Sequence, residues 1–518
     1  MTQMKSVALA LLCASAPLRL SAQAASPANP VPPRFDAFVQ RAITQLNTPG
    51  IAVAVVMDGR TVFAKGYGVR RLGDPAPVDA NTVFQVASNT KATTAAILAM
   101  LVDEGKLKWD DRVEDHLPWF RMSDPYVSHE MRVQDLLSHV SGLSLGMGDL
   151  LWMYSTLDRR GIAERVGKLP IANSFRANYA YDNVLYVVAT ELIEAVEGKS
   201  WDEVIRDRIL RPLGMTSAST TVRGWDPRGN YAAPHEMLDG RLQVVNRDTV
   251  DNIGGTGALN ASVADMAKWV RVQLDSGRVD ATHRLWSADQ TRQMWLGRIS
   301  QTNGRGGVTD VSAGFAEYAL GWNTYDYLGN KVVTHTGGLS GQITRVFLLP
   351  ARHAGFVVLT NAGSSAMTAV TLQLRDWLTG HRNDSTDYVT RLAAPEEQFD
   401  YAAYDRHLDS SRVAGSGPSL PLASYAATWT DPWYGDITTT LEQGKLVIRF
   451  SHTPGFSGDL APWSRDVFRI HFRVAQMPDA FIWFDLDPTG QAVGAHMAPV
   501  YPNTDFSYDW QDLALKRK

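Results

Sequence analysis

The chain has 518 residues, with 50 Lys and Arg against 54 Asp and Glu, and a formal net charge of −4. An apolar fraction of 45% over this length is enough for two or three domains with cores of their own. The near balance of charge gives no indication of a nucleic-acid-binding surface. The single cysteine, Cys13, lies close to the N-terminus, so disulfide or thiol chemistry in the rest of the chain is excluded.

The N-terminus has the pattern of a secretory signal peptide. Lys5 supplies the positive charge, residues 7–12 form a short apolar stretch, and residues 22–24 (Ala-Gln-Ala) fit a cleavage site between small residues. We expect residues 1–24 to be removed and residues 25–34, rich in Ala, Ser and Pro, to form a tether. The apolar stretch is too short to span a bilayer, so no stable membrane span is expected after processing. A periplasmic or secreted location follows.

The central part of the chain predicts both helices and strands. Residues 35–46 have helical spacing and are followed by strands over 50–57 and 61–66, which the turn Asp58-Gly59 joins into a hairpin. The later predicted elements are a buried helix over 93–104, a helix over 183–196, strands over 331–336, 343–349 and 355–360, and a closing helix over 370–378. Helical stretches broken by Gly and Pro fill the region from about 110 to 250.

The character of the chain changes near residue 380. Residues 381–421 are polar or rich in Gly, Ser and Pro and are predicted to be a linker. Residues 422–518 contain short alternating runs that predict a small all-β domain of barrel type. These runs cover residues 435–441, 445–450, 467–474 and 480–485.

The aromatic residues of this β domain have two interpretations. They either fill its own core or cover a pocket of the preceding domain. They include Trp429, Trp433, Tyr434, Trp463 and Trp483.

Three short motifs stand in one order along the chain. They are Ser88-Asn89-Thr90-Lys91, Tyr181-Asp182-Asn183 and His335-Thr336-Gly337. Ser88 and Lys91 are three residues apart, so on a helix they share a face and an amine lies beside a hydroxyl. Such a neighbour activates a weak nucleophile, and an ammonium on a nearly buried helix is costly unless it is used. All three motifs precede the change near residue 380, so we expect a chain ending near residue 400 to keep them together.

With the segments 84–87, 135–143, 212–215 and 320–322 around them, the motifs resemble the class C β-lactamase, DD-peptidase and D-aminopeptidase superfamily of serine hydrolases, which is similar to penicillin-binding proteins. The resemblance covers residues 35–380. It implies an α/β fold of the α+β type, in which helices flank an antiparallel sheet and a helical subdomain is inserted. The β domain resembles the lipocalin-like module of some family members.

The resemblance also implies roles for the motif residues. Ser88 would be the nucleophile, and Lys91 would lower its pKa or move its proton. Tyr181 would be the general base or a proton relay, and as a base its phenol would need a nearby cation such as Lys91 to ionise. Asn183 would orient Lys91 and the substrate. Thr336, Gly337 and Gly338 would form the edge strand beside the substrate, with the N–H groups of Ser88 and Gly338 as oxyanion hole. No metal or organic cofactor is implied.

His335 departs from the class C β-lactamases, which usually carry Lys at this position. A histidine is mostly neutral at pH 7, so a dedicated β-lactamase is disfavoured. His335 would then hydrogen-bond Tyr181, meet a substrate carboxylate or be a structural histidine of the strand. On the second alternative, His335→Lys shifts preference toward carboxylate substrates.

The sequence therefore predicts an exported serine hydrolase that acts through an acyl-enzyme. The favoured substrate is a small molecule or peptide with an amide bond, D-residue-containing peptides included. The alternatives are a β-lactamase, a D-Ala-D-Ala carboxypeptidase, a carboxylesterase, and a peptidoglycan-binding sensor with vestigial activity. No nucleic-acid partner is expected, and the sequence does not indicate an oligomeric state.

Other motifs suggest rival chemistries. Residues 142–146 read Gly-Leu-Ser-Leu-Gly, the pattern of an α/β-hydrolase nucleophile elbow, which requires a strand before the serine. Residues 134–138 predict a helix there instead, so Ser144 is interpreted as a loop residue near the pocket. His129-Glu130 and His235-Glu236 lack the second His of a zinc-hydrolase motif.

Overall fold

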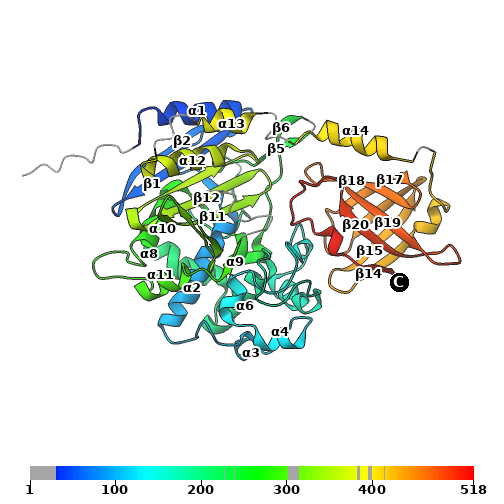
Figure 1. The fold of residues 1–518 in the computed structure, drawn as a ribbon, viewed down its shortest axis with the longest axis horizontal. Coiled ribbons are helices and arrows are strands. Elements are labelled where there is room, and N and C mark those ends of the chain that lie inside the picture. Colours follow the sequence, from blue (N-terminus) through cyan, green and yellow to red (C-terminus); the bar gives the residue numbers. More distant parts are fainter. Residues whose placement is uncertain are drawn as a thin grey trace, which may run out of the picture.

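A computed structural model describes residues 31–518 except for 227, 239, 302–313, 382–385, 395–398 and 414. The predicted signal peptide, its cysteine and most of the predicted tether lie outside the described residues. The chain forms a larger body of helices around a sheet and a smaller C-terminal barrel beside it (Figure 1). Within the described part, none of the helices combines the length and apolar character that a membrane crossing requires.

The larger body is built on a nine-stranded sheet in the order β3-β2-β1-β13-β12-β11-β10-β9-β8, with antiparallel neighbours. The strands are β1 (Gly50–Met57), β2 (Arg60–Arg71), β3 (Asp74–Pro77), β8 (Ile299–Ser300), β9 (Ala316–Tyr318), β10 (Asn323–Tyr327), β11 (Asn330–Leu339), β12 (Gln342–Leu349) and β13 (Ala354–Thr360). Each strand predicted for this region lies within one of them. The mixed α/β fold with an antiparallel sheet is confirmed.

Three helices cover one face of the sheet: α1 (Phe35–Gln45), α12 (Ala366–Thr379) and α13 (Tyr388–Ala393). Val39 of α1 and Val370 of α12 share one apolar core with Val53 of β1. Ala52 and Ala54, the residues before and after Val53 in β1, belong to the core on the other face. Side chains alternate between the faces of a strand, so β1 is buried on both, which explains its continuous apolar sequence.

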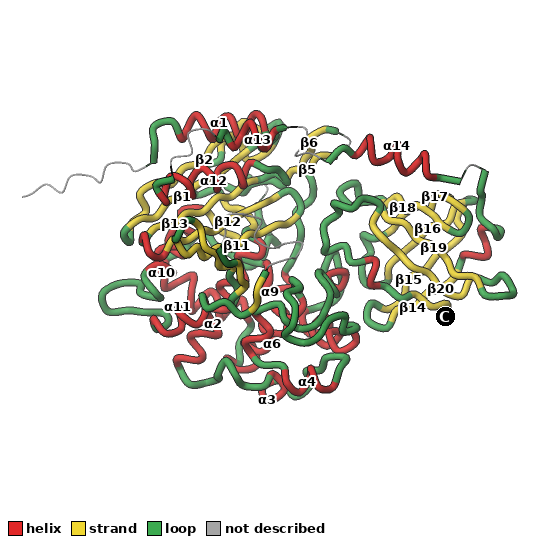
Figure 2. Tube along the Cα trace, in the orientation of Figure 1, coloured by secondary structure: helices red, strands yellow, loops and turns green. Residues whose placement is uncertain are grey.

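The other face carries the helical subdomain (Figure 2). Its helices are α2 (Thr90–Asp103), α3 (Val113–His116), α4 (Pro125–Glu130), α5 (Arg159–Arg165), α6 (Val184–Glu197), α7 (Trp201–Ile205), α8 (Arg211–Leu213), α9 (Gly254–Gly257), α10 (Val263–Leu274) and α11 (Ala288–Met294). Two strand pairs lie outside the main sheet. They are β4 (Val83–Gln85) with β7 (Asn260–Ser262), which are far apart in the sequence, and the hairpin of β5 (His235–Leu238) and β6 (Arg241–Val244). The predicted helix over 93–104 is α2, which begins three residues earlier and ends before Gly105.

The C-terminal domain is a closed eight-stranded barrel. Its strands are β14 (Ala427–Asp431), β15 (Gly435–Glu442), β16 (Lys445–Phe450), β17 (Ser457–Ser464), β18 (Val467–Phe472), β19 (Ala480–Leu486), β20 (Ala492–Pro499) and β21 (Leu515–Arg517). The predicted barrel is therefore confirmed. The predicted linker contains α13 and a further helix, α14 (Tyr401–Ser411), which runs toward the barrel in Figure 1.

Aromatic side chains pack together inside the barrel. Trp429 and Tyr425 both contact Phe484, and Tyr434 contacts Phe450. Trp433, whose exposed fraction is 2%, is buried as well. Trp483 lies on the outer surface, stacked on a histidine. Most of the aromatic residues noted in the sequence thus fill the core of the domain itself.

Candidate active site

Ser88 lies where the chain turns from strand β4 into helix α2. A short 3-10 helix, η1 (Ala87–Asn89), leads directly into α2. Ala87 has a positive φ of 50°, an uncommon conformation for a residue with a side chain. Ala87 and Asn89 are buried, whereas Ser88 is partly exposed. The turn therefore presents one hydroxyl at the start of an otherwise buried helix.

Lys91 reaches back from the first turn of α2 to this hydroxyl. Its Nζ is 3.0 Å from Ser88 Oγ, 2.7 Å from Asn183 Oδ1 and 3.3 Å from the carbonyl oxygen of Thr256 in α9. The side chain is fully buried, and this desolvation lowers the pKa of Lys91 from 10.5 to about 7. The carboxylates of Asp149 and Asp182 oppose the shift. The amine therefore titrates near neutral pH while it contacts the serine.

Tyr181 completes the group around Ser88. Its ring lies 4.8 Å from Lys91 Nζ, and its side chain is hydrogen-bonded to Ser88. Burial raises the pKa of Tyr181 well above 10, and the Ser88 bond only partly opposes this. The sequence left two roles open for Tyr181, a base that a nearby cation helps to ionise and a proton relay. The structure surrounds it so that the phenol keeps its proton.

His139 packs beneath the Tyr181 ring, a contact that the sequence did not predict. The two ring centroids are 4.2 Å apart. The backbone N–H of Asp182 donates to His139 Nδ1 at 3.1 Å, and Ser141 donates to the Asp182 carboxylate at 2.9 Å. Burial lowers the pKa of His139, so the ring is neutral. The segment containing His139 had been noted only as part of a family pattern, without a role for the histidine.

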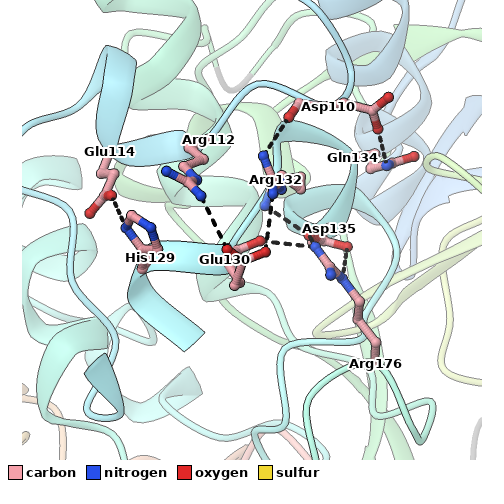
Figure 3. Close-up of polar contacts among 9 residues, drawn as sticks. All are labelled: Asp110, Arg112, Glu114, His129, Glu130, Arg132, Gln134, Asp135 and Arg176. Atoms are coloured by element: carbon pink, nitrogen blue, oxygen red, sulfur yellow. Dashed lines mark hydrogen bonds and ion pairs between the residues drawn. The ribbon is translucent and has the colours of Figure 1, made fainter. Parts of the chain in front are cut away.

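A polar network holds the loop that carries Tyr181 (Figure 3). Arg176 donates twice to Asp135, at 2.6 and 3.1 Å, and Asp135 belongs to the 3-10 helix η2 (Val133–Leu137). The backbone of the same loop bonds to the segment after η2, since the N–H of Ala180 donates to the carbonyl oxygen of His139. The loop is thereby fixed, just before the tyrosine, against η2 and the segment that follows η2.

The two His-Glu pairs considered as zinc ligands form hydrogen bonds and ion pairs with other groups of the protein. His129 contacts Glu114 at 2.6 Å, and Glu130 pairs with Arg112 and Arg132, as Figure 3 shows. In the second pair, the ring of His235 bonds to two backbone groups and its neighbour accepts from the N–H of Gly341. These contacts are structural.

His335 lies on β11 but does not bond to Tyr181. Its Nε2 accepts from the hydroxyl of Tyr318 at 2.9 Å, and its Nδ1 bonds to the carbonyl oxygen of Thr336 at 2.5 Å. Burial, followed by the nearby Lys91, lowers the pKa of His335 to about 3. The ring centroids of His335 and Tyr181 are 6.4 Å apart. His335 is thus a neutral ring with both nitrogens bonded to other groups, and the expected bond to Tyr181 is not made.

The glycines that follow differ sharply in their surroundings. A Cβ at Gly337 would lie 2.1 Å from the carbonyl oxygen of Val86 and 3.0 Å from the Cβ of Ala87. A Cβ at Gly338 would meet nothing within 4 Å, and this residue is exposed. Gly337 therefore lets β11 approach the turn that carries Ser88, and Gly338 leaves the edge open. Thr336, on the same edge, is partly exposed.

Comparison with known proteins identifies the family of the larger domain. A family model described as Beta-lactamase matches residues 35–380. The chain belongs to the beta-lactamase family. A model of a domain of unknown function, DUF3471, matches residues 411–517, which include the barrel.

Two similar relatives of this beta-lactamase-family protein are the unguisins hydrolase ungD of Aspergillus violaceofuscus and penicillin-binding protein 4 of Amycolatopsis lactamdurans. The first is 29% identical over 80% of this chain and 77% of the relative, and the second is 28% identical over 64% and 84%. Among solved structures, the octameric penicillin-binding protein homologue from Pyrococcus abyssi superposes with a TM-score of 0.58 at 21% identity, covering 93% of this chain and 99% of that one. The D-amino acid amidase from Ochrobactrum anthropi SV3 has a TM-score of 0.55 at 18% identity, over 68% and 98%. The resemblance seen in the motifs is confirmed, and the protein is a hydrolase of this fold family.

The barrel of this beta-lactamase-family protein also reaches the site, through residues that the sequence did not single out. The ring of Phe506 lies edge-on to that of Tyr181, with centroids 5.8 Å apart. Tyr508 lines a cavity of about 30 Å³ together with Asp248 and Ser340. Ser340 lies two residues after the exposed Gly338 of β11. The cavity has room for about one water molecule. Ser144 donates to Asp512 of the barrel, not to a catalytic base.

Proposed function

We propose that this protein is an exported serine hydrolase that cleaves an amide or peptide bond of a small peptide through an acyl-enzyme at Ser88. D-residue-containing peptides are included in this substrate class. The observation that carries the proposal is the 3.0 Å contact between Lys91 Nζ and Ser88 Oγ, made by an amine with a pKa of about 7. Such an amine is partly neutral at physiological pH, so it can accept the serine proton.

In the first step, the proton of Ser88 passes to Lys91 Nζ while Oγ forms a bond to the substrate carbonyl carbon. The carbonyl electron pair moves to oxygen, and the N–H groups of Ser88 and Gly338 stabilise the oxyanion. The new ammonium already has acceptors, since Asn183 Oδ1 lies 2.7 Å away and the carbonyl oxygen of Thr256 lies 3.3 Å away. Asp149 and Asp182 supply negative charge around it.

In the second step, the bond from carbon to the leaving nitrogen breaks. The nitrogen takes a proton from the Tyr181 hydroxyl, which regains one from Lys91. A tyrosine that holds its proton suits this relay, and its bond to Ser88 places it beside the reacting atoms. Water then attacks the Ser88 ester and gives a proton to Lys91; the bond from carbon to Oγ breaks, Lys91 returns the proton to Ser88 Oγ, and the acid is released.

The neutral His335 bears on the substrate class. Class C β-lactamases usually carry Lys at this position, whereas this ring is buried and bonded to Tyr318. Substrates without a carboxylate at that point are therefore favoured over β-lactams. A β-lactamase, a D-Ala-D-Ala carboxypeptidase and a carboxylesterase remain the alternatives within the family, and a peptidoglycan-binding sensor is the alternative outside catalysis.

The assignment of Ser88 is tested with a fluorophosphonate probe followed by peptide mass mapping. We expect the adduct on the peptide that contains Ser88, no labelling of Ser88→Ala, and substantial labelling of Ser144→Ala. Labelling of Ser88→Ala together with loss in Ser144→Ala would overturn the assignment.

The substrate is tested with a panel of four compounds: a D-aminoacyl anilide, a D-Ala-D-Ala peptide, nitrocefin and a short-chain nitrophenyl ester. Fastest turnover of the anilide supports the proposal, and turnover of none supports the sensor. Export is tested by N-terminal sequencing of the secreted protein, which we expect to begin at Ala25.

A further inference from the structure

Residues 501–513 connect β20 to β21 and leave the barrel toward the catalytic domain. Trp510 anchors this segment: it is fully buried and stacks on Phe472 of β18, with ring centroids 5.4 Å apart and planes 17° apart. Trp433 of the barrel donates its indole N–H to the carbonyl oxygen of Asp512 at 3.3 Å. Because aromatic side chains fill the barrel, the segment starts from a rigid base.

Asp509 binds the catalytic domain with both carboxylate oxygens. Oδ2 accepts from the N–H of Gly148 at 2.6 Å, and Oδ1 accepts from the N–H of Leu150 at 3.0 Å. These donors flank Asp149, which begins the 3-10 helix η3 (Asp149–Leu151). Asp509 is fully buried, so its contacts form without competing water. The barrel thus fixes the backbone on both sides of Asp149.

Asp149 in turn determines how Asn183 faces Lys91. Its Oδ2 accepts from Asn183 Nδ2 at 2.8 Å, and Asn183 Oδ1 accepts from Lys91 at 2.7 Å. A carboxamide has one donor end and one acceptor end, so a carboxylate on one side leaves the oxygen for the amine. Ser507 of the barrel segment also bonds to the Asp149 side chain. A chain of contacts therefore runs from Asp509 through the backbone on both sides of Asp149, and from Asp149 through Asn183 to Lys91.

The barrel segment 501–513 also packs against Tyr181, through Phe506. Gly146 donates its N–H to the carbonyl oxygen of Tyr181 at 2.9 Å. A Cβ at Gly146 would lie 2.5 Å from the carbonyl oxygen of Phe506 and 2.8 Å from its ring. The catalytic domain thus has a site shaped to receive Phe506 next to the proposed proton relay.

We propose that residues 506–512 of the C-terminal domain complete the active site, with Ser507 and Asp509 as positioning residues that act on Lys91 through Asp149 and Asn183. This inference rests on the proposed function, since it assigns Ser507 and Asp509 a part in the proton transfer at Ser88. The inference also revises the expectation that a chain ending near residue 400 keeps the three catalytic motifs in a working arrangement. Such a chain would leave Asp149 without its contacts to the barrel segment.

The chain of contacts predicts a direction for the pH dependence of acylation. Burial raises the pKa of Asp149 to about 7, and the Ser507 bond opposes this shift and favours the carboxylate form, which in turn raises the pKa of Lys91. Removing the hydroxyl leaves Asp149 more often protonated, so the amine becomes neutral at lower pH. The titratable groups around Lys91 and Asp149 are Asp182, Tyr181, Tyr186, His139, His335 and Asp509.

The test measures the rate of Ser88 labelling by the fluorophosphonate between pH 5 and 9 in the full-length protein. Ser507→Ala should label about fivefold more slowly at its optimum, as expected for one lost hydrogen bond, and its acid-side midpoint should fall below that of the wild type. Ser507→Thr, which keeps the hydroxyl, should restore both. Asp509→Asn should slow labelling at least about tenfold, because one backbone donor then faces an amide N–H. The matched control is Asp485→Asn on the outer surface of the barrel, where the carboxylate contacts His496.

The outcomes separate the two proposals. Absence of a Ser88 adduct in the wild type would overturn the proposed function. A labelled wild type with Ser507→Ala equal to it in rate and midpoint would overturn the positioning role alone. Active-site titration excludes simple misfolding: a variant with fewer reactive sites but an unchanged rate per site and an unchanged midpoint would also count against the proposal.

Discussion

The burial of Lys91 predicts that the wild-type protein is less stable than a variant without its charge. In Lys91→Met, an apolar side chain of similar length takes the place of the amine. The fold lowers the pKa of Lys91 from 10.5 to about 7. At about 1.4 kcal/mol per pH unit, this corresponds to about 5 kcal/mol of free energy of unfolding, of which somewhat more than 4 applies at pH 7.

The replacement also removes a hydrogen-bond donor. Asn183 Oδ1 would lose the ammonium at 2.7 Å, and an unsatisfied buried acceptor costs about 1–3 kcal/mol. The expected gain in stability of Lys91→Met at pH 7 is therefore about 1–3 kcal/mol, together with loss of Ser88 acylation.

The sign of the pH dependence follows from proton binding. Between pH 7 and 10.5 the unfolded chain holds a proton on Lys91 that the folded protein does not, so wild-type stability rises with pH in this window. Below pH 7 both states hold the proton and the difference between the two proteins is constant. The advantage of Lys91→Met should therefore be largest below pH 7 and should shrink by about 1.4 kcal/mol per pH unit above it.

Calorimetric unfolding of both proteins in matched buffers from pH 6 to 9 measures this difference, since other titrating groups cancel between them. Lys108→Met, at an exposed lysine near the other end of α2, is the control and should change stability little. A less stable Lys91→Met, or a difference that stays constant from pH 7 to 9, would refute the reasoning.

Two further predictions concern β11. Gly337→Ala should cost about 1–3 kcal/mol by overpacking against the turn of Ser88 and should slow acylation, whereas Gly338→Ala should fold like the wild type. Equal melting temperatures of the two variants would contradict the first statement. His335→Gln should keep most activity, since a neutral side chain replaces a ring that stays neutral above about pH 3. The unfolded chain protonates this histidine near pH 6.5 but the folded one does not, so wild-type stability should fall relative to His335→Gln as pH drops from 6.5 toward 3. Parallel acid-unfolding curves would argue against this, and large activity loss would show that the bond from Tyr318 matters to catalysis.

The residues that local geometry brings together could be predicted from the sequence. Ser88 and Lys91 are one helical turn apart, and Asn183 directly precedes α6. Strand alternation and turn residues likewise indicated the sheet and the barrel. Such patterns repeat over short distances, so one sequence is enough to detect them.

Contacts between distant loops could not be predicted in this way. Asp149 lies in a 3-10 turn with no periodicity, and the bond from Gly148 to Asp509 spans 361 residues. Burial at Tyr181 could not be inferred from the sequence either, so the choice between an ionised base and a protonated relay stayed open until the structure favoured the protonated form. Local patterns carry no information about which loop of a second domain lies against a site.

The Gly-Leu-Ser-Leu-Gly segment shows how a catalytic pattern can arise from backbone geometry and domain docking. Gly142 and Gly146 have φ values of 89° and 77°, and a Cβ on either would lie within 2.7 Å of a backbone carbonyl oxygen. For Gly146 that oxygen belongs to Phe506 of the barrel, and Ser144 between the glycines donates to Asp512 of the barrel. Each position thus has a structural requirement that involves no nucleophile. Since the segment also holds Tyr181 through the N–H of Gly146, the docking of the barrel and the placement of the proposed proton relay depend on the same small residue.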